Sequence, residues 1–329
     1  MSRDTDSQWH RIDRRMTLKG IAATIGIAGL SGQAAGTPGG GASNCDLVVD
    51  DDDPSNYDSI QAAVDAANSG ETICVAPGTY EEHVVINKAE LTVKKLDLPS
   101  TTPDPVVEAP DGEPYAIEIV ADDVTVKDFI VQGATDGDAE GLTAQNTSGV
   151  HLEDLLIRDN ADRGLTVGHS VNATLKNITA KDNGNDGLTV WQSHNCTVVG
   201  CTAHDNGDNG IYTNGNNNTV KDSTAYDNDD QGIDMSNDHD VVGGTDEEWG
   251  GATVENCESF DNDNGGIELH DDEGIATVKD NHTYDNDIAS NINASGLVLN
   301  LEEDTYSVEV VTGNNFEDGI AVDGVDTDP

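Results

Sequence analysis

The sequence predicts an all-β fold, a single-stranded right-handed parallel β-helix in which short strands wind into stacked coils. One row of residues repeats along the middle of the chain, and its opening glycine recurs after 22 or 23 residues and once after 34. Within a row, apolar and polar residues alternate, which is the spacing of β-strands. A fixed period of this size is typical of stacked supersecondary units. The opening glycines are Gly141, Gly164, Gly187, Gly210, Gly232 and Gly266.

Each row contains three predicted strands. In the row that opens at Gly164, Leu165 and Val167 face inward on the first strand, and 173–175 and 178–180 form the second and third strands. The strands are separated by bends rich in Gly, Asn and Asp, which are residues typical of turns. No row can bury its own apolar face, so we expect coils stacked about 4.8 Å apart to bury a continuous core.

The first 37 residues predict a twin-arginine signal peptide. The pair Arg14-Arg15 precedes an uncharged stretch, 20–30, and a run of small residues, 32–35. This apolar run is too short to span a bilayer. We therefore expect the protein to be exported folded by the twin-arginine route, to be secreted and to have no membrane span, with 38–44 as a flexible linker.

Residues 45–95 are predicted to form an N-terminal cap and the first coils. We expect Asp58 to cap a helix that Gly70 ends, followed by strands at 72–76 and 82–86. Residues 60–80 follow the pattern I-Q-x-A-x-x-x-A-x-x-G-x-T-I-x-V-x-x-G-x-Y, and Glu81 follows it. This segment resembles the N-terminal cap of the pectin-lyase-like superfamily. The resemblance implies a right-handed parallel β-helix whose open end is covered by a short amphipathic helix. It implies no single activity, since that superfamily contains lyases, hydrolases, esterases, epimerases and non-catalytic surface proteins.

The rest of the chain divides into repeats and a C-terminal cap. Residues 96–290 are predicted to be the parallel β-helix repeats, with a Pro-rich loop over 96–114 inserted on an early coil. The period fades after 290, so 291–329 is predicted to be a C-terminal cap and tail. Strands are expected there at 297–301 and 306–311.

The charge of the chain is extreme, with 64 acidic residues against 15 basic ones and a formal net charge of −49. A disordered acidic chain would share this composition, but the inward positions of the repeat are filled by Leu, Ile, Val, Ala and Cys. We therefore favour a folded, halophilic protein of haloarchaeal type, because the Debye length in molar salt is about 3 Å and self-repulsion is screened. Such a charge excludes nucleic acid and anionic membranes as partners.

The five cysteines fall into two groups. Cys196, Cys201 and Cys257 occupy inward positions, and we interpret them as small buried hydrophobic residues. Cys45 and Cys74 are expected on two strands that pair in the first coil. Export would allow them to form a disulfide, which the sequence leaves open.

An Asp-Asn pair closes each row, for example Asp182-Asn183 and Asp205-Asn206. A catalytic residue is needed once, whereas this pair occurs six times. Asp and Asn bond to backbone amides at bends and tolerate left-handed conformations. We therefore predict that the pair, like the repeated threonine of the second strand, is structural.

The positions that break the repeat predict a functional face. On the outer side of the first strand, small polar residues give way over four coils to aromatic and charged ones. Aromatic rings stack on the apolar faces of sugars, and carboxylates and imidazole groups move protons. The candidate catalytic residues are Asp234, Glu268 and His270. The candidate substrate-binding residues on these strands are Trp191, Tyr212 and Asn214.

Asp234 and Glu268 are central to this face. They lie on neighbouring coils, where we expect their Cβ atoms to be about 5 Å apart. When two like charges are this near to each other, the pKa of one carboxyl group is raised, as a general acid requires.

The stretched row carries an additional loop at 237–251. Loops on solenoids mark the binding face, so His239 and Trp249 are further candidates for substrate binding. Asp238, His239 and Asp240 offer hard ligands that favour calcium or magnesium, and no other cofactor is predicted. The same three residues resemble in part the Asp-Pro-His-Asp motif of alginate C-5 epimerases and related lyases, although the proline is missing.

Two functions remain open. The first is a secreted β-helix, expected to be a monomer, that acts on or binds an extracellular polysaccharide or cell-surface glycan as a lyase, hydrolase or epimerase. The second is a non-catalytic extracellular or cell-surface module that binds glycans or proteins. The coils carry few cations, which argues against a polyanionic substrate. They are Lys127, Arg158, Arg163, Lys176, Lys181, Lys221 and Lys279.

Overall fold

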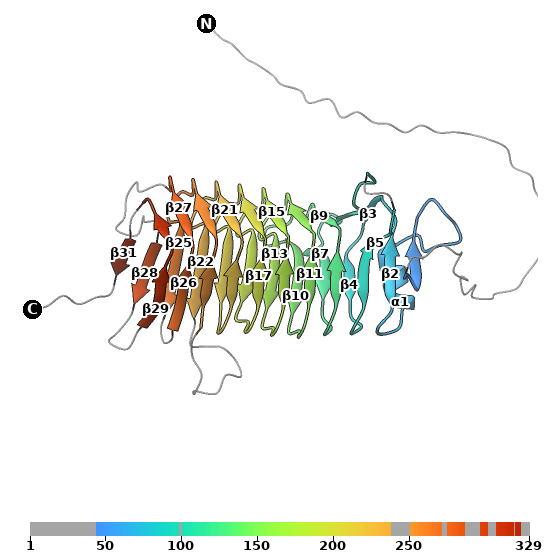
Figure 1. Cartoon of the computed structure of the whole chain (residues 1–329). Helices are drawn as coiled ribbons and strands as arrows, with labels where there is room; N and C mark the ends of the chain where they lie inside the picture. The colour runs from blue at the N-terminus through green and yellow to red at the C-terminus, as the bar shows by residue number, and fades with distance from the viewer. Residues whose placement is uncertain are drawn as a thin grey trace, which may run out of the picture. The chain divides into compact units, whose positions relative to one another are not determined.

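The computed structural model describes residues 44–98, 101–237, 251–271, 275–286, 297–301, 307–318 and 320–323. The chain divides into two compact units, 1–35 and 36–329, and every described residue belongs to the second. Within this unit the strands are stacked side by side along one axis, with the helix α1 at one end and β31 at the other (Figure 1).

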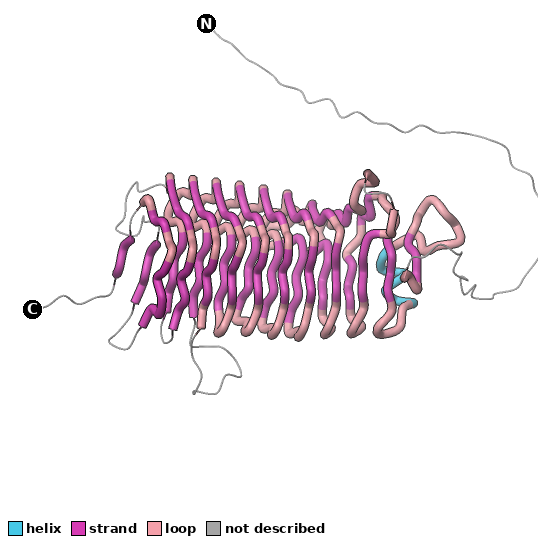
Figure 2. The backbone as a smooth tube through the Cα atoms, in the orientation of Figure 1, coloured by secondary structure: helices cyan, strands magenta, loops and turns pink. Residues whose placement is uncertain are grey.

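The strands form three parallel sheets, called A, B and C, which contain eleven, ten and ten strands in the described part of the chain. Each coil adds one strand to sheet A, then one to sheet B, then one to sheet C (Figure 2). Every strand therefore pairs with the equivalent strand of the next coil. The single-stranded right-handed parallel β-helix that the repeat predicts is confirmed.

The bounds of the strands follow the repeat closely. Sheet A contains β1 (Leu47–Val49), β2 (Thr72–Val75), β5 (Thr92–Lys95), β8 (Thr125–Lys127), β11 (His151–Glu153), β14 (Thr174–Lys176), β17 (Thr197–Val199), β20 (Thr219–Lys221), β23 (Thr253–Glu255), β26 (Ile275–Lys279) and β29 (Ser307–Thr312). Sheet B contains β3 (Thr79–Glu81), β6 (Val106–Glu108), β9 (Ile130–Gln132), β12 (Leu156–Arg158), β15 (Thr179–Lys181), β18 (Thr202–His204), β21 (Thr224–Tyr226), β24 (Glu258–Phe260), β27 (His282–Tyr284) and β30 (Asn315–Phe316). Sheet C contains β4 (Val84–Ile86), β7 (Tyr115–Ile119), β10 (Glu140–Gln145), β13 (Leu165–Gly168), β16 (Leu188–Trp191), β19 (Ile211–Asn214), β22 (Ile233–Asn237), β25 (Ile267–Asp271), β28 (Leu297–Leu301) and β31 (Ile320–Asp323).

The core consists of columns of equivalent residues from successive coils. Leu165 pairs in register with Leu142 on one side and Leu188 on the other, and all three are fully buried. Burial of this apolar column stabilises each coil only when its neighbour is present. Cys201 and Cys257 are buried free thiols of the same core, and burial raises the pKa of each, to about 11 and about 12. The interpretation of the inward cysteines as hydrophobic residues is confirmed, and Cys196 is likewise buried and free.

The Asp-Asn pair forms the corner between sheets B and C. Asp182 has a φ of 56°, in the left-handed region that Asp and Asn tolerate. Asn183 is buried, and its Nδ2 donates to Oδ1 of Asn206 in the next coil at 3.0 Å. Asn206 Nδ2 donates in turn to Oδ1 of Asn228 at 2.9 Å. The pair is therefore structural, as predicted, because the Asn side chains form a continuous ladder that satisfies buried amides.

The N-terminal helix α1 (Ile60–Ala66) lies against the first coils. Its N-cap is Ser59 and not Asp58, since Ser59 Oγ accepts from the backbone N of Ala62 at 3.1 Å. At the other end, Lys88 Nζ donates to three carbonyl oxygens of the last turn. Both helix ends are therefore satisfied.

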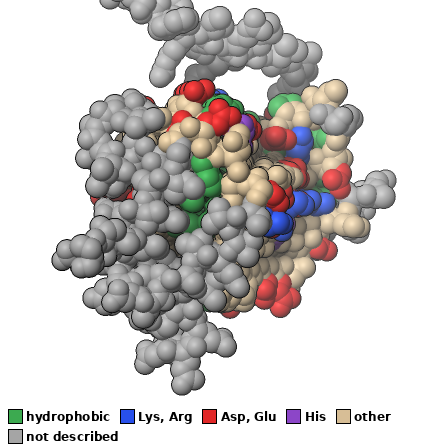
Figure 3. Space-filling view, turned by 60° about the vertical axis from the view of Figure 1, so that its left-hand side comes forward, with side chains coloured by type: hydrophobic (Ala, Val, Ile, Leu, Met, Phe, Trp, Pro, Cys, Tyr) green, Lys and Arg blue, Asp and Glu red, His purple; other side chains and the backbone are tan. Residues whose placement is uncertain are grey.

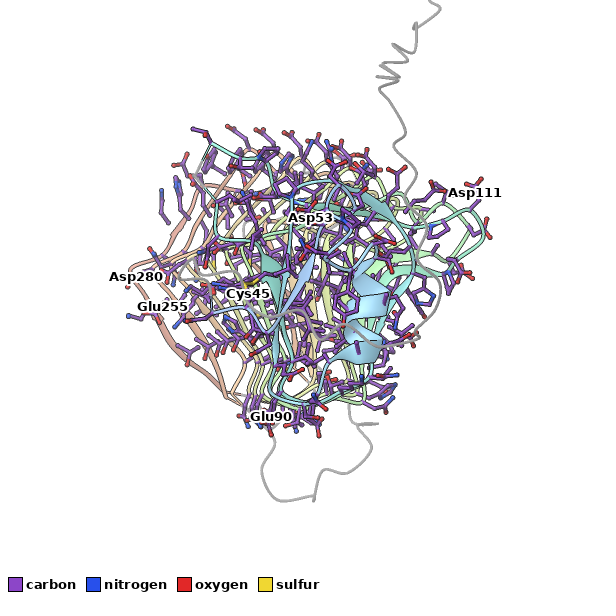
Figure 4. The ribbon with its side chains drawn as sticks, turned by 90° about the vertical axis from the view of Figure 1, so that its right-hand side faces the viewer. Cys45, Asp53, Glu90, Asp111, Glu255 and Asp280 are labelled. Carbon is purple, nitrogen blue, oxygen red and sulfur yellow. A yellow bond between two sulfur atoms is a disulfide. The ribbon has the colours of Figure 1, made fainter. Side chains whose placement is uncertain are left out.

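A disulfide joins Cys45 to Cys74, with their Cα atoms 5.7 Å apart. It links the segment before β1 to β2, near the viewer in Figure 4, which looks along the stack from the end that carries α1. The first strand of sheet A is thereby held covalently as well as by pairing. The bond left open by the sequence is thus present in the structure.

Three expectations differ in detail. The strand expected over 82–86 begins only at Val84, because β3 and β4 belong to different sheets and Glu82-His83 turns between them. The Pro-rich loop over 96–114 contains β6 (Val106–Glu108), which pairs with β3 in sheet B. The segment expected as a C-terminal cap contributes β28 to β31, which continue the three sheets in parallel. These local errors arise because a strand of a few residues is too short to show a sequence pattern of its own. Only its place in the repeat indicates where it begins and ends.

The described helix is far from long or apolar enough to cross a lipid bilayer.

Candidate functional site

The outer face of sheet C carries three columns of side chains, each built from equivalent positions in successive coils. The entry column contains the residues that directly precede the repeat glycines: Glu140, Arg163, Asp186, Asn209 and Gln231. The middle column contains Thr143, Thr166, Thr189, Tyr212, Asp234 and Glu268. The far column contains Gln145, Gly168, Trp191, Asn214 and Ser236. Residues more than 100 positions apart in the chain thus lie on one face.

The strand register brings the predicted site residues together. Tyr212 pairs with Asp234, and Asp234 pairs with Glu268. The two carboxylates therefore lie on adjacent strands, which are separated by about 4.8 Å. Trp191 lies in the next column, and its ring centroid is 6.2 Å from that of Tyr212, with the rings tilted by 30°. The aromatic pair and the carboxylate pair are therefore neighbours.

The face is less open than the sequence suggests. Trp191 is 38% exposed, but Glu268 is only 3% exposed and Asn214 only 2%. The expectation of an exposed patch is wrong for these two residues, because flanking side chains cover them. Gln231 Nε2 in the entry column donates to Glu268 Oε2 at 2.5 Å, and Asn214 Nδ2 donates to Ser236 Oγ at 2.9 Å.

Tyr212 occupies the centre of the face. Its hydroxyl group is 3.2 Å from Ser236 Oγ, which also accepts from Asn214. Burial raises the pKa of the Tyr212 phenol, and the negative charge of Asp234 adds to the effect. The phenol is therefore protonated at neutral pH and is available as a hydrogen-bond donor or acceptor beside Asp234.

The entry column was not among the predicted site residues. Arg163 lies within 3.5 Å of the carboxylate oxygens of Glu140, Asp162 and Asp186. Asp186 in turn accepts from Thr189 Oγ1 at 3.0 Å and from the backbone N and Nδ2 of Asn209 at 3.2 and 3.1 Å. One signal could have found the column. The residue before each repeat glycine changes in every row, from Glu to Arg, Asp, Asn, Gln and Gly, while its neighbours repeat.

Two carboxyl groups near this column have perturbed pKa values. Burial raises the pKa of Glu140, and the nearby positive charge of Arg163 partly offsets the rise. Burial and the nearby charges of Asp186 and Asp230 raise the pKa of Asp208 to about 6. Negative charge is therefore concentrated beside the entry column, where Arg163 supplies a single positive charge.

The other predicted residues are only partly located. His270 pairs with Ser236 through the backbone, and its side chain lies outside the described residues. Asp238, His239, Asp240 and Trp249 also lie outside them, so the calcium or magnesium hypothesis stays a prediction. In the described part of the chain, Asp50, Asp51 and Asp52 hold carboxylate oxygens within 4.8 Å of one another, but Asp51 and Asp52 are exposed and nothing else points to a metal there.

Residues 50–315 match the family described as Pel9A-like, right handed beta helix region. The chain belongs to this Pel9A-like β-helix family. The assignment agrees with the resemblance of the N-terminal cap to the pectin-lyase-like superfamily. No curated protein sequence matches the chain significantly.

Solved structures show the same fold at low identity. Pectate lyase Pel9A is 17% identical, with a TM-score of 0.52 over 78% of this chain and 74% of that chain. The A-module of the mannuronan C-5 epimerase AlgE6 from Azotobacter vinelandii is 14% identical, with a TM-score of 0.49 over 80% of this chain and 93% of that chain. A Geobacillus virus E2 protein, ORF18, is 15% identical, with a TM-score of 0.49 over 78% and 55%. At 17% identity the likeness to pectate lyase Pel9A shows the fold and not the chemistry.

Proposed function

We propose that this protein binds and acts on a polysaccharide with the outer face of sheet C. The observation that carries the proposal is the register of β16, β19, β22 and β25, which places the rings of Trp191 and Tyr212 beside the carboxylates of Asp234 and Glu268. Rings of this kind stack on the apolar faces of sugars, and paired carboxylates transfer protons. A family relative of the same fold that is named a pectate lyase supports a polysaccharide as the partner.

Asp234 and Glu268 take different parts in the proposed reaction. Asp234 is half-buried and lies nearer to solvent, so it is the group that reaches the substrate as an acid or base. Glu268 is covered and bonded to Gln231, so it acts beside Asp234 as a second carboxylate. Cleavage by a lyase or hydrolase, and inversion by an epimerase, all require a positioned proton carrier.

The working environment is part of the proposal. The net charge of −49 and the twin-arginine motif support a protein exported to a high-salt medium. Assays therefore belong in molar salt, where the self-repulsion of the acidic surface is screened.

A polysaccharide panel tests the proposed function. The full-length protein is incubated in molar NaCl with neutral and acidic polysaccharides, and the release of reducing ends or unsaturated products is measured. Asp234→Asn should lower the rate by about 100-fold or more, since a positioned acid or base contributes that much. The matched control is Asp227→Asn, which makes the same change at a left-handed corner outside the face and should leave the rate unchanged.

The burial of Glu268 also favours the second candidate function, a non-catalytic module that binds glycans. In that case the panel yields no product, while the protein is retained by one of the polysaccharides. Equal rates for Asp234→Asn and the wild-type protein would remove Asp234 from the reaction.

A further inference from the structure

We propose that Trp191, Asn209, Tyr212 and Asn214 form a subsite for an uncharged, hydroxyl-rich sugar, so that this face selects a neutral glycan and excludes a polyuronate. We call these four residues the Tyr212 subsite. The inference rests on the proposed function and adds the class of substrate, which narrows the reaction to hydrolysis, because β-elimination and C-5 epimerisation both act on a uronate.

Two buried amides flank Tyr212 in the same coil. Asn209 precedes β19 and is 7% exposed, while Asn214 ends β19 and is 2% exposed. The Oδ1 atoms of both are buried and have no hydrogen-bond partner. Buried polar atoms are normally paired, so two orphan acceptors at the two ends of β19 point to a partner that comes from outside the chain.

The orientation of both amides is set by their other atom. Asn209 Nδ2 donates to Asp186 Oδ1 at 3.1 Å, and Asn214 Nδ2 donates to Ser236 Oγ at 2.9 Å. The asparagines of the ladder at the corner of sheets B and C differ, since Asn206 Oδ1 accepts from Asn183 while Asn206 Nδ2 donates to Asn228. Asn209 and Asn214 thus differ from the ladder asparagines in having an unpaired Oδ1, which they share with Asn216 in the turn after β19.

An orphan acceptor requires a donor. The hydroxyl groups of a sugar donate hydrogen bonds, whereas a carboxylate only accepts them, so the orphan acceptors call for sugar hydroxyl groups as their direct partners and the surrounding charge decides against a uronate. The ring of Trp191, which is 38% exposed and tilted against Tyr212, adds an aromatic surface for the apolar side of the same sugar.

The charges around the subsite favour the same class of ligand. Asp186 touches Asn209, and Asp234 pairs with Tyr212 in the next strand. Arg163 is the one basic residue among the described side chains of the three columns, and three carboxylates already surround it. A uronate bound here would meet like charges at contact distance, where salt screens least.

A binding comparison tests the inference. Retention of the full-length protein is measured in molar NaCl by affinity electrophoresis through gels that contain β-glucan, mannan, polygalacturonate or alginate. The comparison is made with EDTA and then with added calcium. We expect retention by a neutral glycan in EDTA, and none by either polyuronate.

Variants locate the binding on the Tyr212 subsite. Asn209→Leu and Asn214→Leu keep the number and branching of the side-chain heavy atoms, remove the orphan acceptors together with the amide donors, and should each weaken neutral-glycan binding about tenfold. Asn264→Leu is the control, because this half-buried amide bonds to Asp230 at another coil and should change binding less than twofold. Trp191→Ala, at an exposed position, tests the subsite if a leucine variant does not fold.

Each other outcome overturns the inference. Retention by a polyuronate in EDTA, or only after calcium is added, would show a charged ligand that the face accepts directly or through a cation. Unchanged binding of both leucine variants would remove the amides from the subsite. In these cases the proposed function still stands, whereas failure of every polysaccharide to retain the protein would overturn both.

Discussion

Aromatic residues on two faces of the same solenoid are arranged in different ways. On the outer face of sheet B, the rings of His204, Tyr226, Phe260 and Tyr284 stack at centroid distances of 4.7, 5.0 and 4.8 Å, with interplanar angles of 3° to 4°. On sheet C, Trp191 and Tyr212 are 6.2 Å apart and tilted by 30°. In the stack, each inner ring is covered on both faces by its neighbours, so that only ring edges are left for a ligand. A repeated column thus serves the scaffold, and an interrupted column leaves an aromatic surface open.

Charged side chains on the outer face of sheet A can be compared with the polar side chains of sheet C in the same way. Its outer face repeats threonine in one column, and in the next column Lys176 lies 2.6 Å from Glu153 while Lys279 pairs with Glu255. Figure 4 shows Glu255 and Asp280 pointing outward on the same side of the stack. On the face seen in Figure 3, basic side chains are few and gathered together, while acidic side chains are scattered. The charged column of sheet A is therefore paired internally, unlike the Oδ1 atoms of the two amides beside Tyr212.

The largest expected effect comes from breaking a fully paired column. Asn206→Ala removes the partner of Asn183 and of Asn228 in the buried ladder, and should lower the free energy of unfolding by about 4 kcal/mol, because several buried groups lose their bonds. Asn214→Ala, at a residue whose Oδ1 has no partner, should cost less than about 1 kcal/mol. Urea unfolding at fixed salt measures both. Equal losses would contradict the distinction between ladder and face.

The stacked rings of sheet B should matter for stability alone. Phe260→Ala removes the contacts with Tyr226 and Tyr284 and should destabilise the protein by about 2 kcal/mol, from lost ring contacts and apolar burial. Glycan retention should be the same as for the wild-type protein. A loss of retention at unchanged stability would move the binding face to sheet B.

The fold could be predicted because the same pattern of strands and turns recurs in every row of the repeat. Inward positions such as Leu165 and Val167 recur in every row, so one period sets the direction of all side chains. The site could be predicted only in outline. The register that joins Asp234 to Glu268 follows from the repeat, but the burial of Glu268 depends on Gln231, a residue of the neighbouring coil whose type does not repeat. Exposure of an outward residue is set by such flanking side chains, and a period contains no information about them.

The acidic corner beside the entry column should respond to pH. The pKa of Asp208 is raised from 3.8 to about 6 in the folded protein, chiefly by burial. The folded state therefore binds its proton more tightly than the unfolded chain, and the stability that protonation contributes is lost as the pH rises from about 4 to about 6. After allowance for solvent screening the effect is about 1 kcal/mol. Asp208→Asn should remove this slope and be the more stable protein at pH 7.5, as measured by urea unfolding at pH 4.5 and 7.5. A slope that persists in the variant would assign it to another group.

The smallest effect is expected on sheet A. Lys176→Met removes a partly exposed surface ion pair with Glu153, and surface pairs contribute little and are screened by salt. Neither the unfolding midpoint in molar salt nor glycan retention should change measurably. A clear loss of retention would show that the lysine column takes part in binding.

The most direct test compares one aromatic residue from each face. Trp191→Ala and Tyr226→Ala are measured side by side for affinity to the retained polysaccharide and for the unfolding midpoint, in molar salt. Trp191→Ala should weaken binding about tenfold or more with little change in stability, whereas Tyr226→Ala should lower stability and leave binding intact. If Tyr226→Ala abolishes binding in the folded protein while Trp191→Ala binds like the wild type, the outer face of sheet C is not the site.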